Sequence, residues 1–223
     1  MDASTPRTDR PEPPYHVCFV CTGNICRSPL AESVFRAKLA EDGLADEVRV
    51  SSAGTGGWHT GSVADHRTVE VLEEAGYESA HSAQQFQAEW FDGLDLVIAL
   101  DLGHERDLKN LAPTAADAAK VRLLRSYDPK SAGSPEVADP YYGTRADFDI
   151  VLEQVEAAVP GLLRAVHEDL TGRRAAAGSA TDAAGKPGAG GKAGAAGKAV
   201  ADRGPGVDER PGGADAGRME TAR

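Results

Sequence analysis

A short segment near the start of the chain places a thiol and a guanidinium at a spacing that suits oxyanion chemistry. Five residues lie between Cys21 and Arg27 in the run Cys21-Thr22-Gly23-Asn24-Ile25-Cys26-Arg27-Ser28. A loop of this length can turn its backbone N–H groups around one tetrahedral oxyanion, and a helix after it adds the positive end of its dipole. A cysteine in such a hollow is expected to be a reactive thiolate at neutral pH. The segment predicts attack by sulfur on phosphorus, with Arg27 holding two phosphate oxygens.

The residues around these two support the same interpretation, although a cysteine and an arginine at this spacing form a weak pattern alone. Gly23 and Asn24 tolerate the left-handed backbone angles that an inward-turned loop needs. Ser28 can donate a hydrogen bond to the thiolate, and Pro29 suits a first helical turn. Cys18 lies inside an apolar run and is expected to be a core residue.

Two motifs at opposite ends of residues 15–170 resemble those of one known family. Cys21 to Pro29 resembles the signature loop of the low-molecular-weight protein-tyrosine phosphatases, and Asp139-Pro140-Tyr141-Tyr142-Gly143 resembles their general-acid loop. Further matches fall between them in the family's order: Ser51-Ser52-Ala53-Gly54, Trp58, Gly76 with His81, and Ser126-Tyr127-Asp128-Pro129. Two motifs in the right order are more specific than either alone.

The resemblance implies a mechanism that hydrolyses aryl phosphates. Cys21 would attack phosphorus, and Asp139 would protonate the leaving oxygen and later deprotonate the attacking water. Arg27 would bind the phosphate, together with the other loop residues Thr22, Gly23, Asn24, Ile25, Cys26 and Ser28. From its position before a proline alone, Asp139 is better explained as a residue that opens a turn, and the full Asp-Pro-Tyr-Tyr-Gly match is what favours the acid.

The resemblance also implies the walls of the site. Trp58 and Tyr141 would sandwich the phosphotyrosine ring, with Tyr142 as further wall, and Trp58 lies in a glycine-flanked stretch typical of an exposed loop. No metal or other cofactor is expected, because Arg27 and the loop amides can stabilise the charge and the histidines show no metal-ligand spacing.

The resemblance implies further roles for residues around the loop. Asn24 would adopt the left-handed conformation, held by Ser52 and His81, so that His81 braces the loop rather than transferring protons. Cys26 would be a redox partner that forms a reversible disulfide with Cys21. Asp101 follows an apolar run and is expected to cap the next helix.

The ends of the chain differ in composition from its middle. Residues 1–14 are proline-rich and expected to be flexible, and they lack the apolar core of a signal peptide. Residues 172–223 hold 13 of the 25 glycines and no aromatic residue, so we expect a disordered Gly/Ala/Lys-rich tail. That tail has nine Lys and Arg against six Asp and Glu, which leaves −14 for the rest, since the total is −11. An acidic body argues against nucleic-acid binding.

Alternating patterns predict an α/β fold for residues 15–171. Strands are expected near 16–20, 47–52, 95–100 and 120–124, and helices near 29–42, 62–76, 102–111 and 145–169. This alternation indicates a three-layer, doubly wound parallel sheet with the phosphate-binding loop after its first strand. The flavodoxin-like strand order 2-1-3-4 comes partly from the resemblance.

Three functions remain open from the sequence. The first is a phosphatase that acts on tyrosine-phosphorylated proteins as a cytoplasmic monomer. No stretch reaches transmembrane length, and three clustered cysteines suit a reducing compartment. The second is an arsenate reductase, which would need an external thiol because no cysteine follows Cys26. The third is a non-catalytic module that binds phosphotyrosine or a free anion.

Overall fold

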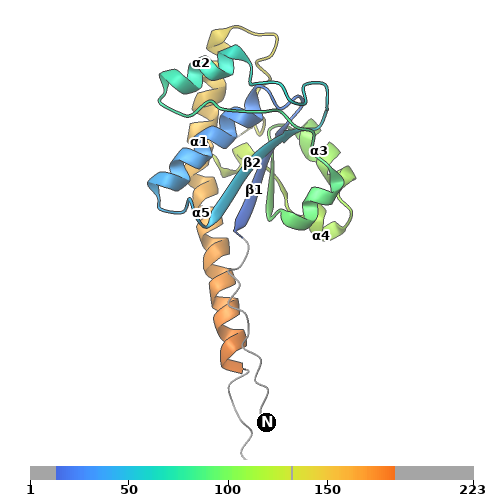
Figure 1. Ribbon diagram of the computed structural model, residues 1–223, viewed down its shortest axis with the longest axis vertical. Coiled ribbons are helices and arrows are strands. Elements are labelled where there is room, and N and C mark those ends of the chain that lie inside the picture. The colour runs from blue at the N-terminus through green and yellow to red at the C-terminus, as the bar shows by residue number, and fades with distance from the viewer. Residues whose placement is uncertain (1–13, 132, 184–223) are drawn as a thin grey trace, which may run out of the picture.

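The central sheet has four parallel strands in the order β2-β1-β3-β4 (Figure 1), which confirms the predicted sheet. This computed structural model describes residues 14–131 and 133–183. The strands are β1 (Tyr15–Cys21), β2 (Val48–Gly54), β3 (Leu96–Ala99) and β4 (Val121–Leu123). Each lies within two residues of the prediction.

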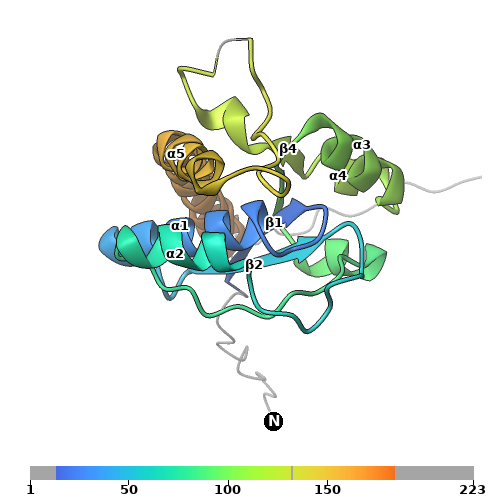
Figure 2. The ribbon, with the colours of Figure 1, turned by 90° about the horizontal axis from the view of Figure 1, so that it is seen from above.

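Helices cover both faces of the sheet and complete the three layers (Figure 2). One face is covered by α1 (Arg27–Glu41), α2 (His66–Glu74) and α5 (Arg145–Ala183). The other face is covered by α3 (Leu102–Leu111), α4 (Ala115–Ala118) and the 3-10 helix η1 (Ala88–Gly93). A second 3-10 helix, η2 (Leu124–Tyr127), follows β4 and contacts α5. The short helices α4, η1 and η2 were not expected from the sequence.

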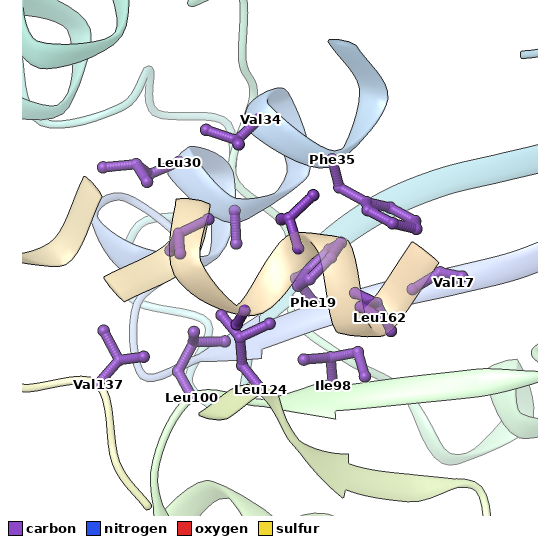
Figure 3. Packing of buried hydrophobic residues seen from close by; sticks show 14 of the residues in the cluster. Val17, Phe19, Leu30, Val34, Phe35, Ile98, Leu100, Leu124, Val137 and Leu162 are labelled. Carbon is purple, nitrogen blue, oxygen red and sulfur yellow. The ribbon is translucent and has the colours of Figure 1, made fainter. Parts of the chain in front are cut away.

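The central strand β1 is buried on both sides, and its alternation divides the core in two. Val17 and Phe19 point to the α1–α5 face, whereas Cys18 and Val20 point to the α3 face. Cys18 is fully buried, as predicted. Figure 3 shows the larger cluster, where Phe19 meets Phe35 edge to face with ring centroids 5.6 Å apart.

Helix α5 continues past the predicted end at residue 169, so the tail predicted to be disordered from residue 172 is helical up to Ala183. Figure 1 shows this extension reaching beyond the sheet. Alanine-rich sequence favours helix. Two arginines just past residue 171 also bind the body of the protein. The Arg173 guanidinium lies 4.7 Å from the Tyr15 ring centroid and pairs with Asp95, and Arg174 pairs with Glu47. The predictions for residues 1–13 and 184–223 lie outside the described residues.

Helix α2 begins at His66, four residues later than the sequence pattern indicates. The Asp65 side chain caps it by accepting a hydrogen bond from the backbone N–H of Arg67 at 2.9 Å. Residues 62–65 are therefore loop, and this places the start of α2 beside the carboxyl end of β1. Among the described helices, none is both long and apolar enough to cross a membrane.

Candidate active site

The segment from Cys21 to Arg27, called the phosphate loop below, joins the end of β1 to the start of α1. Cys21 is the last residue of β1 and is almost fully buried, and its Sγ lies 3.0 Å from Ser28 Oγ. Gly54 pairs with Cys21 across the sheet, and a Cβ there would lie 2.7 Å from the Thr22 carbonyl oxygen. Only glycine lets β2 approach the loop this closely.

Outward-facing carbonyls give the loop its shape. Each accepts a hydrogen bond of 2.8–2.9 Å from a backbone N–H outside the loop: Cys21 from Thr55, Thr22 from Gly56 and Ile25 from Asp65. In a trans peptide the N–H of the next residue points the opposite way. The N–H groups of Thr22, Gly23 and Cys26 are therefore turned toward the hollow above Cys21.

Asn24 holds the turn of the loop, as predicted. Its φ is +55°, the one positive value at a non-glycine position in the described ranges. Its side-chain amide donates to Ser28 and Ser52 at 2.9 Å each, and its carbonyl oxygen accepts from His81 Nε2 at 2.7 Å. The side-chain oxygen accepts from the backbone N–H of Gln84 at 2.8 Å. A strained backbone is thus fixed by four hydrogen bonds.

Arg27 is buried, and it contacts residues from three parts of the chain. One terminal nitrogen donates to Asp101 at 2.9 Å and to the Val137 carbonyl at 3.1 Å. The other lies 3.0 Å from the Asp139 carboxylate and 3.4 Å from the Thr22 hydroxyl. Its buried Nε has no hydrogen-bond partner among the described residues. Such a donor is available to an anion that enters the hollow.

Asp101 caps α3, as expected, and also anchors Arg27. It accepts from the backbone N–H of His104 at 2.7 Å, and His104 Nδ1 lies 3.0 Å from the same carboxylate. Burial alone would raise the pKa of Asp101, but the His104 hydrogen bonds and the charges of His104 and Arg27 hold it well below its usual range. His104 Nε2 lies 2.9 Å from the Thr22 hydroxyl, so α3 is linked to the phosphate loop twice.

The loop from Asp139 to Gly143, called the acid loop below, borders the same cleft as Cys21. The Asp139 side chain is half exposed, Tyr141 is 39 % exposed and Tyr142 is 97 % exposed. The two tyrosine rings meet edge to face, 4.9 Å between centroids. Asp139, both tyrosines and the exposed Trp58 line one cleft of about 310 Å³. Its other lining residues are Cys21, Thr22, Gly23, Ile25, Cys26, Arg27 and His59.

The structure thus brings the predicted site residues together in two layers. The cleft lining contains the three proposed chemical groups, the predicted aromatic walls and four further loop residues. Asn24, Ser28, Ser52 and His81 lie behind the loop and support it. Cys26 is buried in the cleft wall, and this burial raises the pKa of its thiol to about 12.

Several residues of the site were missed from the sequence. His59 lines the cleft, and its Cδ2 lies 2.9 Å from where a Cβ on Gly23 would stand. His104 reaches the loop from α3, and Arg67 reaches the acid loop from α2. Of these three residues, only His59 could have been suspected from the sequence, because it follows Trp58 directly. The described residues contain no group of three His, Cys, Asp or Glu that could hold a metal ion.

Comparisons with known proteins agree with this geometry. Residues 16–172 match the family model described as low molecular weight phosphotyrosine protein phosphatase. A low molecular weight protein-tyrosine-phosphatase of Streptomyces coelicolor is 62 % identical over 162 residues, which cover 72 % of this chain and 99 % of that protein. Low molecular weight protein-tyrosine phosphatase A of Mycobacterium tuberculosis H37Rv is 51 % identical over 70 % of this chain and 94 % of its own length.

Solved structures give the same result. The crystal structure of a protein tyrosine phosphatase from Entamoeba histolytica, with Hepes in its active site, superimposes with a TM-score of 0.67 at 30 % identity. The match covers 70 % of this chain and 98 % of that one. By its sequence, its fold and the arrangement of its phosphate and acid loops, the chain belongs to the low molecular weight phosphotyrosine protein phosphatase family, a family of hydrolases.

Proposed function

We propose that this protein hydrolyses phosphotyrosine in proteins through a cysteinyl-phosphate intermediate. The Cys21 thiolate attacks phosphorus, so that an S–P bond forms while the P–O bond to the tyrosine oxygen breaks. Asp139 gives its proton to the departing phenolate. Water then attacks phosphorus, Asp139 takes a proton from it, and the S–P bond breaks to release inorganic phosphate.

The observation that carries this proposal is the set of donors around Cys21. The buried Arg27 Nε has no partner among the described residues, and the outward bonds of the Cys21, Thr22 and Ile25 carbonyls turn the following N–H groups toward the same hollow. These fixed donors suit the equatorial oxygens of a phosphoryl group in transfer, where a preorganised charge lowers the barrier. A ligand without an acceptor oxygen at this point would leave the Arg27 Nε unpaired.

Ser28 supports the nucleophile in this scheme. Its hydroxyl accepts from Asn24 Nδ2 and has one proton, which either Cys21 at 3.0 Å or the Ala53 carbonyl at 3.2 Å can accept. A charged acceptor makes the stronger hydrogen bond, so a thiolate at Cys21 would draw this proton. The Ser28 hydroxyl therefore favours the reactive form of the cysteine.

The cleft supports an aromatic substrate. Trp58 and Tyr141 stand at its mouth with exposed rings, and Tyr142 widens the wall. Aromatic pairs are worth about 0.5–1.5 kcal/mol beyond area burial, which would favour a tyrosine ring over a serine side chain. We therefore propose tyrosine-phosphorylated proteins as substrates. The monomeric state and the cytoplasmic location stay predictions from the sequence.

The test is hydrolysis of p-nitrophenyl phosphate, a phosphotyrosine peptide and the matching phosphoserine peptide between about pH 5 and 8. Wild type should turn over the first two, and Cys21→Ser should show no activity above background. Asp139→Asn should lose roughly 10²–10³-fold on the phosphotyrosine peptide and less on p-nitrophenyl phosphate, whose leaving group needs little protonation.

Two alternatives are separated by the same assays. Inactivity toward both aryl phosphates, with arsenate-dependent consumption of a small thiol, would mean that the loop serves an arsenate reductase. Binding of the phosphotyrosine peptide without phosphate release or thiol consumption would indicate a non-catalytic binding module. The cleft walls and Asp139 favour the phosphatase over both.

A further inference from the structure

Arg67 connects the acid loop to the rest of the site, although the reaction scheme gives it no role. Its guanidinium donates to the Gly143 carbonyl at 2.8 Å and to the Tyr141 carbonyl at 3.0 Å. These two carbonyls follow Asp139 in the acid loop. Among the described residues, these hydrogen bonds join the backbone of Tyr141 to Gly143 to helix α2.

The guanidinium is itself fixed in place. Its Nε and one terminal nitrogen form a bidentate pair with the Asp65 carboxylate, at 2.9 and 2.8 Å. Its carbon lies 4.4 Å from the centroid of the buried Phe148 ring. Hydrogen bonding with Arg67 lowers the pKa of Asp65 and raises that of Arg67, so both groups are charged at neutral pH. Four N–H groups of one rigid fork are thus directed at once.

The same turn of α2 also contacts the phosphate loop. The Asp65 N–H donates to the Ile25 carbonyl at 2.8 Å, and the Thr68 hydroxyl donates to the Cys26 carbonyl at 3.4 Å. Asp65 to Thr68 therefore contacts the loop that carries Cys21 on one side and the loop that carries Asp139 on the other. A rigid connection of this kind fixes the separation between two reacting groups.

We propose that Arg67 is a positioning residue for general-acid catalysis, which holds the acid loop where Asp139 can protonate the leaving oxygen. This inference rests on the proposed phosphatase function. Loss of Arg67 would free the Tyr141 and Gly143 carbonyls and let the Asp139 carboxyl move out of reach of the leaving oxygen. The phosphate loop would stay intact, since Arg27 and Asn24 hold it without Arg67.

The experiment compares two leaving groups in a double-mutant cycle. Arg67→Gln should lower kcat/KM by about tenfold on a phosphotyrosine peptide and by less than about threefold on p-nitrophenyl phosphate, because only the poorer leaving group needs the acid. In an Asp139→Asn background the Arg67→Gln change should alter kcat/KM for the peptide by less than about twofold. Inhibition by inorganic phosphate should be at least as strong as in the wild type, because the phosphate loop stays intact and the Asp139 carboxylate competes less for Arg27.

Arg145→Gln is the matched control. Arg145 also ties the start of α5 to α2, through Glu70 and Glu74, but among the described residues it makes no hydrogen bond to the acid loop. Its loss should change neither substrate's kcat/KM. Arg67→Lys should behave like Arg67→Gln, because an ammonium cannot make the fork's contacts together. Arg67→Lys keeps the charge and the aliphatic stem. If Arg67→Gln does not fold, the same double-mutant cycle is measured with Arg67→Lys.

The outcomes distinguish this inference from the proposed function. Equal losses on both substrates, or a loss that persists in the Asp139→Asn background, would overturn the positioning role of Arg67 while leaving the phosphatase intact. Inactivity of the wild type toward both substrates would instead overturn the proposed function.

Discussion

The Asp139 carboxylate and the Arg27 guanidinium lie 3.0 Å apart, so the proposed general acid and the proposed phosphate ligand are paired with each other. Arg27 is buried and Asp139 is half exposed. A phosphate group that enters the hollow must take this guanidinium nitrogen from Asp139 and also meets the negative charge of the carboxylate. The pair therefore opposes anion binding, while it holds the Asp139 carboxylate close to the Arg27 guanidinium.

Removing the Asp139 charge should strengthen binding of inorganic phosphate. A half-exposed ion pair is worth about 0.2–1 kcal/mol, so Asp139→Asn should lower the inhibition constant for phosphate by a factor of about 1.4 to 5 while turnover falls. The measurement is competitive inhibition of p-nitrophenyl phosphate hydrolysis. Asp42→Asn, on the far end of α1, should leave the constant unchanged. Weaker phosphate binding in Asp139→Asn would contradict this account of the pair.

Asn24 should be important for two separable reasons. Asn24→Gly keeps the left-handed backbone but loses the side-chain bonds to Ser28, Ser52 and Gln84, whereas Asn24→Ala adds strain at φ +55°. We expect both variants to lose activity, and the alanine variant to be less stable than the glycine variant by about 1 kcal/mol. Urea unfolding measures this difference. Equal stabilities would mean that the backbone angle is not strained.

Gly56 should control the position of the Trp58 ring. A Cβ on Gly56 would lie 1.8 Å from Trp58 Cζ3, so Gly56→Ala must displace the indole from the cleft wall. We expect KM for a phosphotyrosine peptide to rise roughly three- to tenfold, as a lost aromatic contact would predict, with inhibition by phosphate unchanged. Gly93→Ala, where nothing lies within 4 Å of the added carbon, is the control. An unchanged KM would show that Trp58 does not contribute to binding of the phosphotyrosine ring.

Asp101 should make stability depend on pH. Its pKa in the folded protein is below the unfolded value of about 3.9, so its stabilising effect is full above about pH 4 and is lost as pH falls through the folded pKa. Asp101→Asn should therefore be less stable than wild type at pH 7, by on the order of 1–2 kcal/mol, and the gap should narrow below about pH 4. Urea unfolding at several pH values measures the gap. A gap that stays constant with pH would show that the Asp101 charge contributes nothing.

Oxidation should join Cys21 to Cys26. Mild peroxide would convert Cys21 to a sulfenic acid, and condensation with the Cys26 thiol would form a disulfide and release water. Both side chains line the same cleft, and the Cys26 thiol, with its pKa raised to about 12, stays protonated until then. Mass spectrometry should find this disulfide, and a thiol reductant should restore activity. Cys26→Ser should instead accumulate irreversible oxidation at Cys21; a sulfonic acid at wild-type Cys21 without the disulfide would refute the pairing.

Much of the fold and site followed from the sequence because the signals are local. Cys21 and Arg27 belong to one loop, and Gly23 and Asn24 permit its turn, so neighbours in the chain define the phosphate loop. The apolar run of β1 predicts a strand buried on both sides, and Asp101 predicts a helix cap. The acid loop had to be matched to a family, because a short Asp-Pro run has many uses.

The tertiary structure alone decided which distant groups meet. Arg67 and the Gly143 carbonyl are 76 residues apart, Arg27 and Asp101 are 74 apart, and Thr22 and His104 are 82 apart. The pairs of Arg173 with Asp95 and of Arg174 with Glu47, which hold the extended end of α5 against the body, also join distant parts of the chain. Local pattern fixes the type and place of a loop or helix, but long-range pairs depend on how the layers pack. The sequence of two motifs therefore determines which reactive side chains the protein carries. The packing of α2, α3 and α5 around these motifs determines how those side chains are placed relative to one another.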